Sequence, residues 1–532
     1  MAQTLSRAGI QRIFSLSGNH IMPLYDAALD ARVAITHVRH EGAAVHMADA
    51  WARLTGEPGV TLFTGGPGHA NAVGALYTAL ASESPVVMLS GHAPLAEVGR
   101  GSFQEIRQAE MAAPVAKESW TAKSAAGLGA DIARAIRIAT SGRPGPVHVS
   151  LPFDLLEEKT AADGVPAADA FRAIPAELGE RHADAALELL ANAQRPLILT
   201  GSVMSGDRDG GLRARLAEAA GVPVIAMEGP RGLADASLGA VASVIARADA
   251  IVLLGKQPDF TLKFGKAPAI AADCRVAVID PDADALHRAA KALGPERAAL
   301  SAHADTLPAA RRLIERCAAR RVKESAWTSE VEAALNTRPT LWKTHAPRPD
   351  GPVHSLDVAR ALQARIDSTP RTVLIADGGE FCQWIQAGTR ASARLINGPA
   401  GSIGGGIPFG LGAKLARPGA PVIVTSGDGS AGYHLLELET ALREKLAFTV
   451  VIGNDARWNA EHQIQLRAYG KDRAFGCELL PSRYDQVAAA LGAHGEHVTR
   501  AADLPAALER AAASGKPAVV NVMIEGAAAP TV

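Results

Sequence analysis

Short apolar runs alternate with alanine-rich stretches over almost the whole chain. Residues 59–65 (GVTLFTG), 84–91 (SPVVMLSG) and 145–152 (GPVHVSLP) have the length of buried strands, whereas 71–82 (NAVGALYTALAS) is typical of a helix. Strands that alternate with helices in this way form parallel sheets with helices on both faces. The alternation therefore predicts an α/β protein made of doubly wound parallel sheets.

Two stretches interrupt this alternation and divide the chain. Residues 157–170 and 336–354 are rich in glycine, proline and polar residues, as linkers are. A chain of 532 residues is long enough for about three domains. We predict three α/β domains, over residues 1–160, 180–335 and 350–525.

Charge and composition exclude several classes of function. The formal net charge of −1 offers no field for nucleic acid or a membrane surface. Apolar runs stay shorter than the roughly 20 residues of a membrane span, and the start of the chain lacks a signal-peptide core. Four cysteines without CxxC spacing suggest neither a disulfide framework nor a zinc site. We expect a cytoplasmic protein with a small-molecule substrate and no nucleic-acid or membrane partner.

Two polar clusters follow neighbouring apolar runs in the last third of the chain. Gly427-Asp428-Gly429 comes directly after one run and Gly453-Asn454-Asp455 after the next. In an open parallel sheet, ligands bind outside the carboxyl ends of the strands, so both clusters should face one site. GDG is also a common turn sequence, so the first cluster alone would be a weak signal.

The residue types in these clusters predict a phosphate and a metal ion. The backbone amides of Gly429 and Ser430, at the start of a helix predicted over 431–445, would form an anion site. Asp428, Asn454 and Asp455 supply the oxygen atoms that Mg²⁺ and Ca²⁺ prefer, often together with phosphate.

The spacing of the two clusters resembles the fingerprint of thiamin diphosphate-dependent enzymes. In that family GDG is followed by Asn-Asn, and here Asn454 stands 27 residues after Gly427. The resemblance implies thiamin diphosphate with Mg²⁺ as cofactors, with Asp428, Asp455 and the backbone carbonyl of Arg457 as metal ligands. Asp455 departs from the usual asparagine, and its extra charge should hold the metal more strongly but repel the diphosphate.

A second motif, in the first domain, supports the resemblance. Residues 36–53 (THVRHEGAAVHMADAWAR) are similar to the RHE motif of the acetolactate synthase-like branch. This implies that Glu41 hydrogen-bonds the aminopyrimidine of the cofactor, so that its thiazolium can lose a proton. A glutamate at a helix start is also simply a favourable partner of the helix dipole.

Other segments imply further cofactor contacts. Residues 397–416 look like the segment under the cofactor, which implies that the carbonyl of Gly401 accepts from its 4′-amino group and that Ile403 keeps it bent. The motif at 376–384 implies that Gly379 approaches the diphosphate. An ordinary glycine-rich helix entry with a core isoleucine would look the same. In this family the two ends of the cofactor are held by different subunits, which implies a homodimer or homotetramer.

The branch of the family is less sharply defined. Gln104 lies in an FQE motif that acetolactate synthases share with 2-hydroxyacyl-CoA lyases. His20 stands where benzaldehyde lyase has its active-site histidine, and an imidazole is a plausible proton shuttle, although it could equally cap its loop. Glu461 stands where pyruvate decarboxylases have a catalytic glutamate, or it is a solvated helix charge. We take Gln104, His20 and Glu461, with Glu41, as the candidate catalytic residues.

Two departures weaken a strict acetolactate synthase interpretation. Gln257 replaces the arginine that lies near the second keto acid, where Lys256 could act only as a point charge, and Ile464 replaces a tryptophan of the acceptor pocket. The segment 229–255 is compact and has no intact glycine fingerprint, so we expect neither FAD nor an ADP group.

Three functions remain open. The first is an acetolactate synthase-like carboligase or decarboxylase of 2-keto acids, which makes or breaks a carbon–carbon bond next to a carbonyl. The second is a 2-hydroxyacyl or benzaldehyde-type lyase acting on acyloins or 2-hydroxyacyl-CoA. The third is a catalytically silent paralogue, against which Glu41 argues. A nucleotide-binding protein would need a P-loop or GxGxxG after a strand, and 401–410 (GSIGGGIPFG) has no Lys-Ser/Thr ending.

Overall fold

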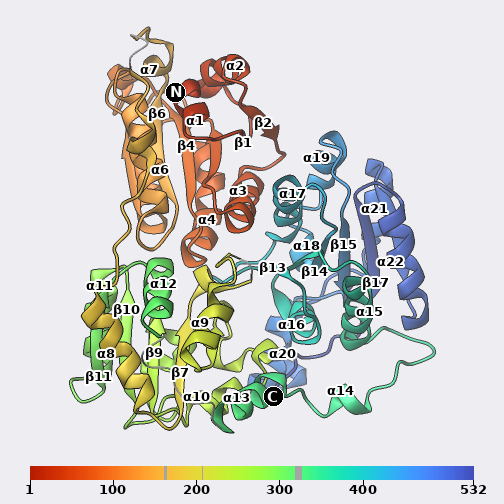
Figure 1. Cartoon of the computed structure of the whole chain (residues 1–532). Coiled ribbons are helices and arrows are strands. Elements are labelled where there is room, and N and C mark those ends of the chain that lie inside the picture. Colours follow the sequence, from red (N-terminus) through yellow and green to blue (C-terminus); the bar gives the residue numbers. More distant parts are fainter. Residues whose placement is uncertain (161–163, 207, 318–325) are drawn as a thin grey trace.

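Three parallel sheets form the framework of the chain (Figure 1). The computed structural model describes residues 1–160, 164–206, 208–317 and 326–532. The predicted fold class, α/β with three doubly wound parallel sheets, is confirmed. The predicted linker over 157–170 lies partly outside the described residues. None of the described helices is both long and apolar enough to cross a membrane.

The first sheet has the strand order β2-β1-β3-β4-β6-β5. Its strands are β1 (Arg12–Ser15), β2 (Ala34–His37), β3 (Gly59–Phe63), β4 (Val86–His92), β5 (Glu118–Thr121) and β6 (Val147–Pro152). The α-helices around it are α1 (Ala2–Arg7), α2 (Met22–Asp30), α3 (Glu41–Thr55), α4 (Pro67–Ala81), α5 (Gln108–Ala112), α6 (Leu128–Thr140) and α7 (Phe153–Glu157).

The middle sheet has the order β11-β10-β9-β7-β8. Its strands are β7 (Pro196–Thr200), β8 (Val224–Ala226), β9 (Ala250–Leu254), β10 (Arg275–Asp280) and β11 (Ala298–His303). Its α-helices are α8 (Glu180–Ala191), α9 (Leu212–Ala220), α10 (Val241–Ile245), α11 (Ala283–Leu293), α12 (Thr306–Cys317) and α13 (Ala326–Asn336).

The last sheet repeats the order of the first, as β13-β12-β14-β15-β17-β16. Its strands are β12 (Val373–Ala376), β13 (Ala393–Ile396), β14 (Val422–Gly427), β15 (Thr449–Asn454), β16 (His494–Val498) and β17 (Ala518–Met523). Its α-helices are α14 (Leu341–Thr344), α15 (Ser355–Ser368), α16 (Gly379–Gly388), α17 (Gly406–Ala416), α18 (Asp428–Ala431), α19 (Glu437–Arg443), α20 (Asn459–Tyr469), α21 (Tyr484–Leu491) and α22 (Leu504–Ala513).

Helices α3 and α17 join the first and last domains. Each follows the second strand of its sheet, and the two helices lie side by side (Figure 1). Small residues permit the close approach: a Cβ atom on Gly412 would lie 2.5 Å from the carbonyl oxygen of Met47. The guanidinium of Arg53 lies over the ring of Phe409 at 5.2 Å and donates to the carbonyl of Ile396. This contact explains the glycine at position 412, whereas Gly406 packs against Asp377 and Gly410 against the sheet.

The predicted helix over 431–445 is interrupted. Helix α18 ends at Ala431, turns occupy 432–436, and α19 begins at Glu437. The turns are held by the loop before α17, where the ring of Tyr433 packs on Gly404 and His434 Nδ1 bonds the carbonyl oxygen of Gly404 at 2.7 Å. This tertiary contact redirects a segment whose residues alone favour a helix.

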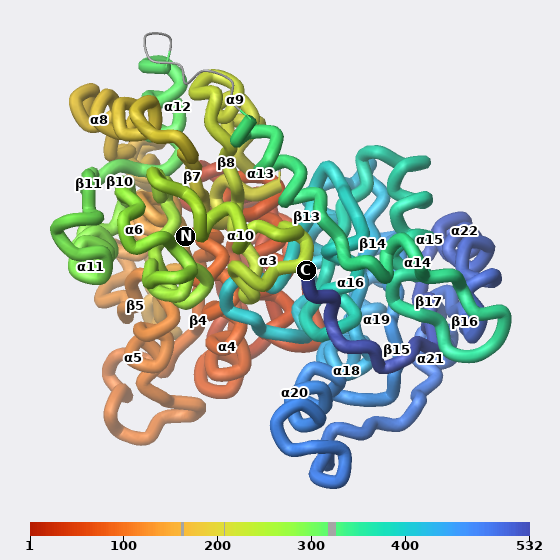
Figure 2. The backbone as a smooth tube through the Cα atoms, turned by 90° about the horizontal axis from the view of Figure 1, so that it is seen from below, coloured from red at the N-terminus to blue at the C-terminus, as the bar shows by residue number. Residues whose placement is uncertain are grey.

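The carboxyl-terminal segment packs along α16 and α20 (Figure 2). The indole Nε1 of Trp384 donates to the carbonyl of Ala528 at 2.8 Å, and Asn459 Nδ2 donates to that of Ala527 at 2.9 Å. These bonds tie the end of the chain to α16 and to the start of α20, which follows the strand that ends at Asn454.

Candidate active site

The two polar clusters of the last domain lie side by side. Strands β14 and β15 are parallel neighbours, and Gly427 pairs with Gly453 in their register. Asp428 and Asp455 therefore follow the two strands at the same edge of the sheet, where ligands of parallel sheets bind.

Both carboxyl groups of this pair are held in an unfavourable environment for a charge. Burial raises the pKa of Asp428 to about 6, although the backbone amides of Gly429 and Arg457 act in the opposite direction. Burial, and then the neighbouring Asp428, raises the pKa of Asp455 to about 7. Asp428 Oδ2 is buried without a hydrogen-bond partner in the described part of the chain. A divalent cation would satisfy this oxygen and relieve the repulsion within the pair.

The turn after β15 brings further oxygen atoms to this edge. Ala456 has a φ of +54°, in the left-handed region, and its N–H donates to Asn454 Oδ1 at 3.2 Å. The side chain of Arg457 turns back, with Nε donating to the carbonyl of Asp455 at 3.2 Å. In the described ranges no cluster of three or more His, Cys, Asp or Glu side chains could hold a metal. A cation here would have to complete its coordination with backbone carbonyls and ligand oxygens. The oxygen-only set fits Mg²⁺.

Asn454 is fully engaged inside the protein. Its Nδ2 donates to the carbonyl of Ser482 at 2.9 Å and to Asn521 Oδ1 at 3.2 Å. Its side chain therefore shapes the turn that carries Asp455, and its predicted contact with a cofactor stays a prediction.

The glycines and Ser430 of the first cluster have different surroundings. A Cβ atom on Gly429 would lie 2.6 Å from the ring of Trp458, so packing alone requires glycine there. Around Gly427 a Cβ atom would meet nothing within 4 Å. Ser430 is buried in α18. This helix has only four residues, so its amides can act as hydrogen-bond donors but add little helix dipole. The prediction of one long helix is corrected, and the anion site at the amides of Gly429 and Ser430 stays a prediction.

Asp377 organises the neighbouring loop, and sequence reasoning missed it. Its buried carboxylate accepts N–H groups from Gly378 at 2.8 Å, Gly404 at 3.0 Å and Gly406 at 3.1 Å. It thus joins the end of β12 to the loop that precedes α17. Its place directly after the apolar run TVLIA was the signal that could have revealed it.

Gly379, Gly401 and Ile403 belong to this loop region. Gly379 begins α16 with a φ of +90° and open space on its Cβ side. Gly401 is exposed with a φ of +65°. Ile403 is half-buried, and a Cβ atom on Gly378 would lie 2.3 Å from its Cγ2, so it presses on the backbone at the end of β12.

Glu41 begins α3, as predicted, and is held by a neighbour from α4. His40 caps the helix by accepting the N–H of Gly42 at 3.1 Å. The buried carboxylate of Glu41 accepts from Asn71 Nδ2 at 3.0 Å. Asn71 was not predicted, although it begins the stretch 71–82 that is typical of a helix.

A second unpredicted acid, Glu437 of α19, holds the start of α3 from the last domain. Its Oε1 accepts the backbone N–H groups of Arg39 and His40, both at 3.0 Å. Glu437 is 1% exposed, and burial raises its pKa. The backbone just before Glu41 is therefore fixed by a residue that lies 398 positions from Arg39 in the sequence.

His20 lies at the carboxyl edge of the first sheet. Its Nδ1 shares a hydrogen bond with Thr64 Oγ1 at 2.8 Å, and its ring stacks on Phe103 at 6.2 Å. Burial, with a smaller contribution from His92, lowers its pKa, so its imidazole is neutral at neutral pH. Thr64 was not predicted, although it directly follows the strand 59–63.

Gln104 and Glu461 differ in their surroundings. Gln104 has a φ of +58°, and its Oε1 is buried without a partner among the described residues. Glu461 is exposed in the first turn of α20. The structure brings Gln104 close to the turn at Gly66, but in one chain no hydrogen bond or ion pair between described residues joins Glu461 to His20 or Gln104.

Contacts at the ends of the strands of the middle sheet join the middle domain to the first domain. Arg143 pairs with Glu83 and with Asp280 at the end of β10.

Lys256, after β9, is 5% exposed and pairs with Asp259 at 2.8 Å. Its ammonium group is thus engaged within the protein.

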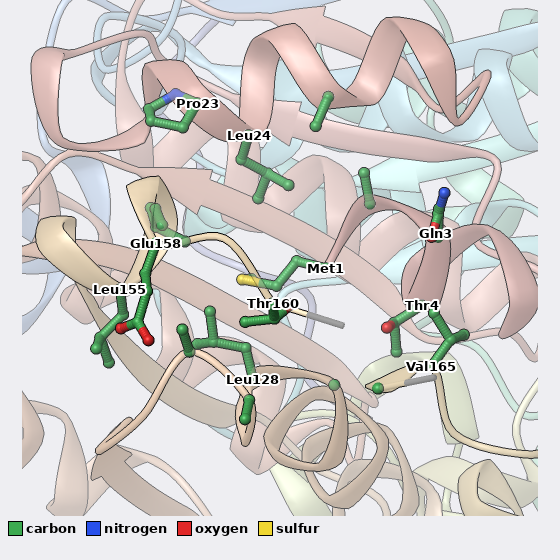
Figure 3. A pocket seen from close by; sticks show the side chains of 17 residues that line it. Met1, Gln3, Thr4, Pro23, Leu24, Leu128, Leu155, Glu158, Thr160 and Val165 are labelled. Carbon is green, nitrogen blue, oxygen red and sulfur yellow. The ribbon is translucent and has the colours of Figure 1, made fainter. Parts of the chain in front are cut away.

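The first domain has a hollow on its surface (Figure 3). It is lined by α1, α2, α6 and α7, with Leu24, Leu128 and Glu158 among its side chains. It contains none of the candidate site residues.

Both the first and the last domain match families of known proteins. Residues 1–111 match the family described as "Thiamine pyrophosphate enzyme, N-terminal TPP binding domain" and residues 377–522 match the corresponding C-terminal TPP binding domain. A probable acetolactate synthase of Mycobacterium bovis is 34% identical, over 99% of this chain and 95% of the relative. 2-Hydroxyacyl-CoA lyase 2 of Bos taurus is 29% identical, over 98% of this chain and 89% of the relative. The lyase of the same name from Homo sapiens is 28% identical over the same shares of both chains.

The three-sheet fold, the two matched domains and the full-length similarity agree with one another. The chain belongs to the thiamine pyrophosphate enzymes.

Proposed function

We propose that the protein is a thiamin diphosphate- and Mg²⁺-dependent enzyme that makes or breaks a carbon–carbon bond next to a carbonyl. The preferred reaction is that of an acetolactate synthase-like carboligase or decarboxylase of 2-keto acids. The observation that carries the proposal is the pair of buried Asp428 and half-buried Asp455 at the ends of adjacent strands, in which Asp428 Oδ2 lacks a partner among the described residues.

The last domain would hold the diphosphate and the metal. Asp428, Asp455 and the backbone carbonyl of Arg457 would bind Mg²⁺. The amides of Gly429 and Ser430 and the open backbone at Gly379 would face the diphosphate.

The first domain would supply the acid and the proton-handling groups. When bound, the cofactor supplies a carbon nucleophile that adds to a carbonyl. Glu41, fixed by Asn71, would hydrogen-bond the aminopyrimidine, with Gly401 and Ile403 as the facing residues of the last domain. His20, neutral beside Thr64, can accept a proton, and Gln104 can bind a substrate oxygen. Glu461 is the third candidate for proton handling.

Two copies of the chain would complete each site. The support is the arrangement in this family, in which the two ends of the cofactor are held by different subunits. We infer a homodimer or homotetramer in which the first domain of one subunit faces the last domain of another.

A lyase acting on acyloins or 2-hydroxyacyl-CoA is the second candidate. The observation in its favour concerns Lys256, the residue before Gln257. Its ammonium group pairs with Asp259 and donates to the carbonyl of Gln257. It is therefore not free to bind the carboxylate of a second keto acid. The 2-hydroxyacyl-CoA lyase relatives point the same way.

Proton NMR separates these functions. The purified protein is incubated with Mg²⁺ and pyruvate, or with an acyloin, with and without thiamin diphosphate. Cofactor-dependent acetolactate formation supports the carboligase, and cleavage of the acyloin with pyruvate untouched supports the lyase. Cofactor binding without turnover of either substrate class indicates a silent paralogue, and failure to bind the cofactor contradicts the proposal.

A further inference from the structure

One buried side chain ties together three strand ends beneath the candidate site of the first domain. Gln108, in the first turn of α5, is 1% exposed. Its Oε1 accepts the N–H of Gly66 at 3.0 Å, and its Nε2 donates to the carbonyl of Gly91 at 3.1 Å and to Ser150 Oγ at 3.2 Å. These partners lie after β3, in β4 and in β6. Donor and acceptor are both used, so an amide of this length is required.

The backbone that Gln108 holds lies directly against two candidate catalytic residues. A Cβ atom on Gly66, which has a φ of +60°, would lie 2.6 Å from the carbonyl oxygen of Gln104. A Cβ atom on Gly91 would lie 2.5 Å from the Cβ of His20. Any displacement of Gly66 or Gly91 is therefore transmitted to Gln104 or His20.

Gln104 needs such support because of its backbone conformation. A φ of +58° is unfavourable for a residue with a side chain, and such conformations persist only where the surrounding structure fixes them. Its buried Oε1 has no partner among the described residues, so its own side chain does not supply the restraint.

We propose that Gln108 is a positioning residue, whose amide sets the places of Gln104 and His20 through Gly66 and Gly91. This proposal rests on the proposed function, since it takes Gln104 and His20 as the groups that act on the substrate. Gln108 itself contacts backbone and Ser150, and does not act on the reacting atoms.

The test replaces Gln108 by methionine, which has nearly the same volume but no amide. We expect turnover per cofactor-loaded subunit to fall by roughly 10- to 100-fold, with unchanged affinity for thiamin diphosphate and Mg²⁺, because the cofactor contacts lie elsewhere. Gln386→Met is the matched control: Gln386 is also 1% exposed, lies in α16, and has an unpartnered Nε2. It should keep normal turnover.

Hydrogen exchange of Gly66 tests the same geometry without any activity. The N–H of Gly66 should exchange faster in Gln108→Met than in the wild type or Gln386→Met. If Gln108→Met does not fold, Gln108→Glu serves instead: it retains an acceptor for Gly66 but loses both donated bonds, so turnover should fall while Gly66 stays protected.

The outcomes separate this proposal from the proposed function. If the wild type binds no cofactor and turns over nothing, the proposed function fails, and protection of Gly66 still decides whether Gln108 holds the turn. Normal turnover in Gln108→Met with a lower melting temperature would show a packing role only and overturn the proposal. Unchanged exchange of Gly66 in Gln108→Met would overturn it as well.

Discussion

Asp428 and Asp455 stand side by side at the ends of two adjacent parallel strands, and the charge of Asp428 raises the pKa of Asp455. Two carboxyl groups with raised pKa values keep protons in the folded protein that the unfolded chain releases at the same pH. Stability contributed by the pair therefore falls as the pH rises from about 4 through the raised pKa values near 6 and 7.

A divalent cation should remove this penalty. Because Mg²⁺ must displace the bound protons, we expect it to raise the melting temperature more at about pH 8 than at about pH 5.5, where the pair is largely protonated. Differential scanning fluorimetry with Mg²⁺ against NaCl at equal ionic strength measures this. Equal shifts at both pH values would argue against a metal at the pair.

Replacing Asp455 by asparagine keeps an oxygen ligand but removes one titrating group. We expect Mg²⁺ to bind still. Its affinity should change with pH about half as steeply as in the wild type, because only Asp428 then releases a proton. Titration calorimetry at several pH values measures it. Loss of all cofactor affinity would instead show that the additional charge is essential.

Replacing Glu41 by glutamine tests the acid of the first domain. The amide oxygen can still accept from Asn71, so the local fold should persist. We expect turnover to fall roughly 10²- to 10⁴-fold with cofactor still bound, measured by product formation and by calorimetric titration of thiamin diphosphate. Glu57→Gln, an exposed position just after α3, is the control. Unchanged turnover in Glu41→Gln would remove this residue from the mechanism.

The sequence was sufficient to predict the central strands, because each of them is a continuous apolar run. It was not sufficient for edge strands such as β5 and β16, where exposed and polar residues such as Glu118 and His497 interrupt the apolar pattern. Likewise, residues directly after strands showed where Asp428 and Asp455 meet. Glu437 could not be found in this way, because it lies 398 residues from Arg39 and no local pattern records that contact. The same holds for the break before α19, which depends on Gly404.

Glu437 should be more important for stability than its exposed neighbour. Glu437→Ala removes the buried acceptor of two partly buried N–H groups, those of Arg39 and His40, which costs about 0.5–1.5 kcal/mol for each hydrogen bond. Denaturant unfolding should show this loss, together with faster hydrogen exchange at His40. Glu439→Ala removes two partly exposed ion pairs, with Arg39 at 3.5 Å and with Arg443 at 3.2 Å, and should change stability by less than about 1 kcal/mol. Similar effects of the two variants would contradict the role of Glu437 in fixing the backbone just before α3.

The close contact of α3 with α17 predicts opposite effects for two glycine-to-alanine changes. Alanine favours a helix over glycine by about 1 kcal/mol, yet the new Cβ at Gly412 would lie 2.5 Å from a backbone oxygen that cannot move without its helix. We expect Gly412→Ala to destabilise the protein by about 1–3 kcal/mol in denaturant unfolding, because overpacking outweighs the propensity gain. Gly419→Ala, where a Cβ meets nothing within 4 Å, should be neutral or slightly stabilising. If Gly412→Ala proved stabilising instead, the two helices would have to be able to separate, and the first and last domains would not be locked through α3 and α17.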